Sequence, residues 1–150
     1  MKKYLLLAGM LLMTNAYSVQ LHNYLQIKDA VANGKQVRIV TDFSKCISDA
    51  NQGNRPNFSG AFTPNEIIIN NDADYITASL MHFTLNHPTS PGQPIYEFNR
   101  YVLTNTGELT LSMTALNAAN YTPIAAKVTW HCKTGDSARF YTGFRKHRHQ

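Results

Sequence analysis

The chain has 150 residues, of which 43% are hydrophobic and 15% are charged, and its formal net charge is +5 at pH 7. This length supports a single domain with one hydrophobic core, and no linker or internal repeat indicates a second domain. The excess of positive charge is mild, and no basic run is interleaved with aromatic residues, so the composition argues against a nucleic-acid-binding protein.

The N-terminal segment has the composition of an export signal. Two lysines precede a short apolar run, and small and polar residues follow it. A transmembrane anchor is the alternative, but the apolar run has about half the length that a bilayer requires. We therefore expect a signal peptide at 1–18, cleaved after Ser18 or after Ala16, and a mature domain at 19–150 with no transmembrane segment. Such a protein would be periplasmic or secreted.

The mature domain is expected to begin with one helix. Apolar residues recur at close to helical spacing in residues 19–35, and Asn33 with Gly34 provides a stop signal. The later segments are β-branched or alternate between apolar and polar residues, and they predict about seven strands. Those segments are "QVRIVTDF", "EIIIN", "DYITASLMHFTLN", "PIYEFNRYVLT", "ELTLSMT", "AKVTWHCK" and "ARFYTGF".

Short turns join several of these strands, and "NTG" and "TGDS" both predict hairpins. We therefore expect a mainly β (α+β) fold, an antiparallel meander wrapped into a barrel-like shape with the N-terminal helix packed against it. Two polar loops, Ser48–Gly60 and Asn86–Pro94, interrupt the pattern and are expected not to pack deeply.

The two cysteines, Cys46 and Cys132, are expected to form a structural disulfide. In "KVTWHCK", Val128, Trp130 and Cys132 fall on one face of a strand, which places Cys132 toward the core. An exported chain enters an oxidising space, and two cysteines allow one pairing. A metal site is a weaker interpretation because neither cysteine has a second cysteine or a well-spaced histidine pair beside it. A catalytic cysteine would need a partner histidine and a reason to remain reduced.

The search for catalytic motifs is negative: G-x-S-x-G, H-E-x-x-H, the P-loop and C-x-x-C are all missing. We expect no catalytic residue, no metal ion and no cofactor. His82 and Arg100 each fall on an otherwise apolar face of a predicted strand, and the loop Asn86–Pro94 could bring them together. They form a hypothetical site for an anionic or carbonyl-bearing ligand. The alternative is that a bulge changes the phase of a strand, or that both side chains lie in water.

Several segments together resemble the VirK-type secreted proteins. They are "IKDAVANGKQVRIVTDFSKC", "MHFT", "PIYEFNRYVL", "NTGELTLS" and "VTWHC", followed by an aromatic strand. The resemblance covers nearly the whole of the expected mature domain. It implies an exported protein of bacteria that live with or in a host, with a suspected part in virulence and no settled enzymatic activity. Only the two cysteines carry over, as a structural pair.

Three functions follow as hypotheses. The first is a host-associated interaction protein without catalysis, and the second is a carrier whose barrel holds a small apolar or anionic ligand. The third is a hydrolase with an unrecognised site. We expect the first, with a host protein or a small ligand as partner and a monomeric state. The basic tail, 145–150, is expected to be a solvated chain end rather than an anion site.

Overall fold

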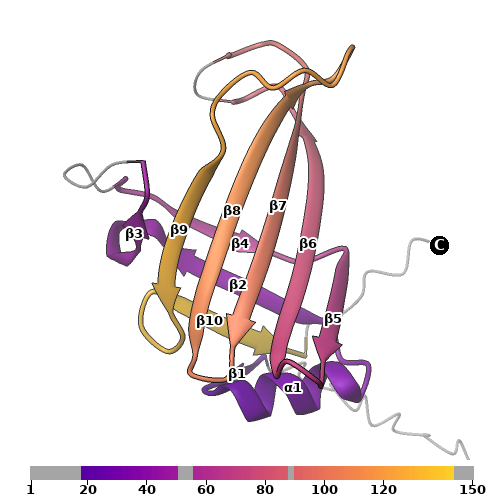
Figure 1. The fold of residues 1–150 in the computed structure, drawn as a ribbon, viewed down its shortest axis with the longest axis vertical. Coiled ribbons are helices and arrows are strands. Elements are labelled where there is room, and N and C mark those ends of the chain that lie inside the picture. Colours follow the sequence, from indigo (N-terminus) through magenta and orange to yellow (C-terminus); the bar gives the residue numbers. More distant parts are fainter. Residues whose placement is uncertain (1–17, 51–55, 88–89, 144–150) are drawn as a thin grey trace, which may run out of the picture.

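The computed structural model describes residues 18–50, 56–87 and 90–143. The predicted basic tail and the signal peptide, apart from Ser18, lie outside these ranges. Within them the chain forms two antiparallel β-sheets, one α-helix and one short 3-10 helix (Figure 1). None of the helices in these ranges is long and apolar enough to cross a membrane.

The four-stranded sheet has the order β1-β10-β2-β4, and all its neighbours are antiparallel. Its strands are β1 (Val19–Leu21), β2 (Val37–Asp42), β4 (Ser59–Phe62) and β10 (Ala138–Thr142). The six-stranded sheet has the order β3-β9-β8-β7-β6-β5 and is also antiparallel throughout. Its strands are β3 (Ile47–Ser48), β5 (Glu66–Asn70), β6 (Tyr75–Thr84), β7 (Ile95–Thr104), β8 (Glu108–Asn117) and β9 (Val128–Lys133).

The helix α1 (Tyr24–Ala32) is shorter than the sequence pattern indicates. Asn23 caps it, because its side chain accepts a hydrogen bond from the backbone N–H of Gln26 at 3.0 Å. The residues before this cap pair with β10 instead of extending the helix. At the other end Gly34 adopts a φ of +69°, which is the left-handed conformation that ends a helix.

Asp74, in the turn between β5 and β6, fastens α1 to the six-stranded sheet. Its carboxylate lies 3.3 Å from the Lys28 ammonium and accepts hydrogen bonds from the Tyr24 hydroxyl and from Asn105. These hydrogen bonds, that of Asn105 foremost, lower the pKa of the Asp74 carboxyl. The helix is thereby held over the ends of β5 and β6.

The core lies between the two sheets at the end that α1 covers. Ile27 of α1, Leu103 of β7, Leu109 of β8 and Phe140 of β10 are all buried there. The space left among these side chains is about 20 Å³, which is room for about one water molecule. This half of the molecule is therefore filled.

The strands β6, β7 and β8 are each ten residues long, and Figure 1 shows them rising well beyond the smaller sheet that crosses behind them. Successive side chains along these strands point to opposite faces of the six-stranded sheet. Their inner face therefore packs on the four-stranded sheet along only part of its length.

The mainly β class with one N-terminal helix is confirmed, but the barrel is wrong. β9 pairs with β3 and β8, and β5 pairs only with β6, so the hydrogen-bonded ladder ends on both sides and never closes. The "NTG" hairpin between β7 and β8 is confirmed, with Gly107 at a φ of +85°.

The "TGDS" hairpin is wrong. The turn instead carries the chain from β9 in one sheet to β10 in the other. The Ser137 hydroxyl accepts a hydrogen bond from the Lys133 backbone N–H at 2.7 Å, and Ser137 is buried. This contact holds the corner without pairing the two strands. The sequence pattern also missed β1, β3 and β4, because strands of two to four residues are too short to show a period.

Candidate functional site

A cavity of about 550 Å³ lies between the sheets in the half of the molecule away from α1. It exists because the far halves of β7 and β8 reach past the four-stranded sheet. Beyond the four-stranded sheet, chain segments around Phe58, His87 and Ala125 lie over the inner face of β7 and β8. We call this space the inner cavity; it is bounded by these segments, by Phe43 and Trp130, and by Glu97, Asn99 and Met113.

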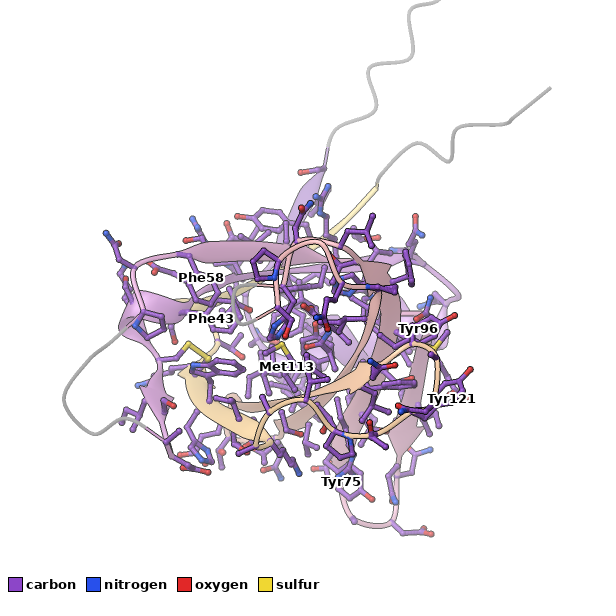
Figure 2. All side chains as sticks on the ribbon, turned by 90° about the horizontal axis from the view of Figure 1, so that it is seen from above. Phe43, Phe58, Tyr75, Tyr96, Met113 and Tyr121 are labelled. Atoms are coloured by element: carbon purple, nitrogen blue, oxygen red, sulfur yellow. A yellow bond between two sulfur atoms is a disulfide. The ribbon has the colours of Figure 1, made fainter. Side chains whose placement is uncertain are left out.

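One wall of the inner cavity is aromatic. The Phe43 ring lies 4.6 Å from Phe58, 5.0 Å from Trp130 and 6.2 Å from Phe62, measured between ring centroids. Figure 2 looks into this end of the molecule and shows Phe43 and Phe58 together, with Met113 of β8 nearer the centre. The wall provides the tilted and edge-on ring contacts that favour aromatic guests.

Two local features position Phe43. It begins the 3-10 helix η1 (Phe43–Lys45), whose start is capped by Asp42 through the backbone N–H and hydroxyl of Ser44. Hydrogen bonding to Ser44 lowers the pKa of the Asp42 carboxyl. At the end of η1, the Cys46–Cys132 disulfide ties it to β9, with 4.6 Å between the two Cα atoms. The predicted disulfide is thus confirmed, and both of its cysteines are buried.

The opposite part of the cavity carries polar groups from β7. Asn99 is 5% exposed, whereas its neighbours Phe98 and Arg100 are both exposed, so Asn99 points inward. Its amide nitrogen Nδ2 is buried and has no hydrogen-bond partner in the part of the chain that the structure describes. Two residues earlier on the same face, the Glu97 carboxylate lies 3.1 Å from Nε2 of His82, its register partner on β6. A buried amide donor without an acceptor is uncommon in a folded protein.

The loop Asn86–Pro94 does more than the sequence indicates. His87 within it is only 5% exposed and lines the inner cavity, although the loop was expected not to pack deeply. The sequence of this loop consists mainly of prolines, a glycine and polar residues, without the period of a strand or a helix. Sequence analysis therefore could not identify His87 as the side chain that points inward.

The structure separates His82 from Arg100. Each lies on the strand face that the sequence pattern indicates, but those faces are the two sides of the six-stranded sheet. Arg100 is opposite Ser79 on β6, three positions from His82, and an odd offset places side chains on opposite faces. His82 instead pairs with Glu97 on the inner side, and Arg100 points outward.

Arg100 lies in a groove of about 650 Å³ on the outside of the six-stranded sheet. Its apolar lining includes Ile68, Met81 and Phe98, which are 52%, 49% and 37% exposed. Lys127 and Glu66 also line it, and within the described segments Arg100 has no ion-pair partner. We call this surface the outer groove.

Aromatic side chains extend the outer groove toward the far end of the sheet. Phe83, which is 53% exposed, lies 5.7 Å from Tyr96 on the neighbouring strand. Tyr96 in turn stacks on Tyr121 with parallel rings 5.8 Å apart, and Figure 2 shows this pair on the outside of the sheet. The sequence could not show that these aromatic residues lie together on the outside of the six-stranded sheet.

Other binding chemistry has little support in the described part of the chain. No group of three histidine, cysteine, aspartate or glutamate side chains lies together there as metal ligands would. His131 and Asp49 form an exposed pair at 3.1 Å on the far side of β9, and no third ligand joins them.

The fold and these surfaces define a disulfide-bonded, two-sheet β protein with a cavity between the sheets and an apolar groove outside. The model of the family described as VirK protein matches residues 20–121, and the chain belongs to this family. A crystal structure of a VirK family protein from Legionella pneumophila is similar, with a TM-score of 0.73 and 31% identity. The match covers 81% of this chain and 98% of that one. No curated protein matched the sequence.

Proposed function

We propose that this chain is an exported protein of a host-associated bacterium that acts by binding a host protein and not by catalysis. Its VirK family membership supports the host association, and its disulfide is consistent with a location outside the cytoplasm. The single observation that carries the binding role is the outer groove, where apolar side chains of neighbouring strands remain exposed around an arginine that has no ion-pair partner among the described residues.

The composition of the outer groove favours one kind of partner. Aromatic residues, methionine and arginine are the residues most enriched where proteins bind one another. The lining has two cationic side chains, Arg100 and Lys127, and one carboxylate, Glu66, so the groove has a net positive charge. An apolar segment of a partner protein that carries an acidic side chain would complement both properties.

The test is a pull-down from host-cell lysate with the exported protein and matched variants. A true partner is retained by the wild type and lost with Phe98→Ser and with Arg100→Glu. Leu25→Ser is the control, because Leu25 is 72% exposed on α1 and its loss removes apolar surface elsewhere. Proteins captured equally by all four chains would contradict the groove as the binding surface. Monomeric behaviour in light scattering is expected, since no self-association is needed.

Export by a signal peptide is part of this proposal. The protein recovered from the periplasm or the medium should lack its first 16 or 18 residues, because signal peptidase cuts after small residues. Intact-mass spectrometry measures this directly. A full-length mass in that fraction would contradict cleavage.

A second function, a carrier of a small ligand, is favoured by the inner cavity. Its volume of about 550 Å³ is within the range of small-molecule sites, roughly 300–1,000 Å³. Native mass spectrometry of the protein as exported is the test. A reproducible mass increment that disappears on denaturation supports the carrier, and its absence from protein purified without organic solvent counts against it.

A further inference from the structure

The inner cavity is lined by a buried hydrogen-bond donor that lacks an acceptor among the described residues. Asn99 is nine-tenths buried, lines the cavity, and its Nδ2 donates to no described group. Leaving such a donor unpaired destabilises the folded protein, and a leucine there would avoid the cost. A ligand with an acceptor oxygen would satisfy it.

The charge in the cavity lining argues against an anionic ligand. The Glu97 side chain is 14% exposed and contacts one imidazole, that of His82. Arg100 and Lys127 line the outer groove and not the inner cavity, and His87 is the one basic side chain among the described residues that line the cavity. A carboxylate guest beside Glu97 would meet like charge in a region shielded from water, whereas a hydrogen-bond donor would be attracted.

The two polar groups lie on the same face of one strand and line the same cavity. Glu97 and Asn99 are two residues apart on one face of β7, which separates their Cα atoms by roughly 7 Å. Elsewhere in the same lining, Phe43, Phe58 and Trp130 form an apolar wall suited to a flat ring system.

We propose that the inner cavity binds an uncharged aromatic molecule with an amide-like edge. The ligand oxygen accepts from Asn99 Nδ2, its N–H donates to the Glu97 carboxylate, and its rings lie against Phe43 and Trp130. This inference rests on the carrier function. It differs from the hypothesis of an anionic or carbonyl-bearing ligand held by His82 and Arg100, because it places a carbonyl-bearing ligand on the inner face of β7, away from Arg100.

The experiment uses Trp130 as the reporter, because it is the single tryptophan of the chain and it lines the cavity. Protein labelled with 5-fluorotryptophan gives one fluorine resonance, which is followed during titration with three probes of the same ring system. They are naphthalene-2-carboxamide, 2-naphthoate and 2-naphthylmethylamine. The carboxamide should saturate the shift at a concentration at least tenfold lower than the naphthoate.

Variants assign the two contacts. Asn99→Leu should weaken carboxamide binding about tenfold, which corresponds to the loss of one hydrogen bond. Glu97→Gln should weaken carboxamide binding several-fold, because a neutral amide oxygen replaces the carboxylate as acceptor, and should improve naphthoate binding by removing the like charge. Leu25→Ser, on the surface of α1, should change neither.

The outcomes separate the ligand class from the carrier function. Naphthoate or the amine binding as tightly as the carboxamide would overturn the amide class while leaving the carrier in place. A fluorine resonance unmoved by all three probes would also overturn the class, and native mass spectrometry would then decide the carrier by itself. Unchanged carboxamide binding in a folded Asn99→Leu variant would exclude the assigned contact.

Discussion

The two halves of the space between the sheets are built from the same strands and differ in what they contain. Near α1, the inner face of β7 carries Tyr101 and Leu103, both buried, and the remaining void is about 20 Å³. Toward the other end the same face carries Asn99 and Glu97, and a cavity of about 550 Å³ remains. The inner face of β7 thus carries two polar residues, Glu97 and Asn99, between the buried apolar residues Ile95 and Tyr101.

This difference shows how coverage, and not strand composition alone, creates a candidate site. The four-stranded sheet and α1 pack against one half of the long strands and exclude solvent from it. The other half is bounded by segments without regular structure, and it can therefore keep polar groups and open volume. Stability should depend mainly on the filled half, and binding on the open half.

The largest expected effect concerns the disulfide, which lies beside the aromatic wall. Cys132→Ser should lower the free energy of unfolding by about 4–5 kcal/mol, because the bond closes a long loop and restricts the unfolded chain. The sequence separation of the two cysteines is 86 residues. Urea unfolding measures the loss, with the reduced wild type as the matched control. Two titratable thiols per molecule in the natively exported protein would contradict the bond itself.

A truncation in each half compares them directly. Leu109→Ala, in the filled half, should cost about 2–5 kcal/mol because it leaves a cavity among buried neighbours. Met113 lies on the same face of β8, four residues after Leu109, and lines a space that is already open. Met113→Ala should therefore cost about 1 kcal/mol or less. Equal losses in urea unfolding would show that the open half closes in solution.

Asn99→Leu should raise the free energy of unfolding of the ligand-free protein by about 1–3 kcal/mol. The substitution removes a buried donor that has no partner and replaces it with an apolar group of similar size. Thermal and urea unfolding measure the gain, and Thr114→Val on the outer face of the neighbouring strand is the control for replacing a polar side chain by an apolar one of similar size. A clear loss of stability would mean that the Asn99 amide is satisfied in solution.

Arg100→Ala should have the smallest effect on stability, within about 0.5 kcal/mol, because the side chain is exposed and has no ion-pair partner in the described segments. The same variant should abolish binding of the host partner if the outer groove is the docking surface. A marked loss of stability would instead identify Arg100 as a structural residue, and the groove would lose its main support.

Much of the local structure could be predicted from the sequence. The alternation in "KVTWHCK" correctly places Trp130 and Cys132 on the buried face, and His131 on the exposed one. The segments of β2 and of β5 to β10 were recognised, as was the turn that ends at Gly107. These features depend on neighbours within a few residues, which the sequence displays directly.

The candidate sites could be predicted only in part. His82 and Arg100 were both expected on faces where they could meet, yet the register of β6 on β7 places His82 on the inner side of the sheet and Arg100 on the outer side. Both faces of "IYEFNRYVL" include large apolar residues, so the pattern did not reveal that Glu97 and Asn99 point inward. A one-residue difference in register reverses every such assignment.

The sequence by itself determined the strand-rich class, the N-terminal helix and the one possible disulfide, since propensity, period and cysteine count are local or combinatorial properties. Only the tertiary structure decided that the turn after Lys133 joins two sheets, that the ladder stays open, and that Phe43 packs against Trp130 in the wall of a cavity. These outcomes depend on which distant segments pack together. The hydrophobic period of one segment does not determine its packing energy with another.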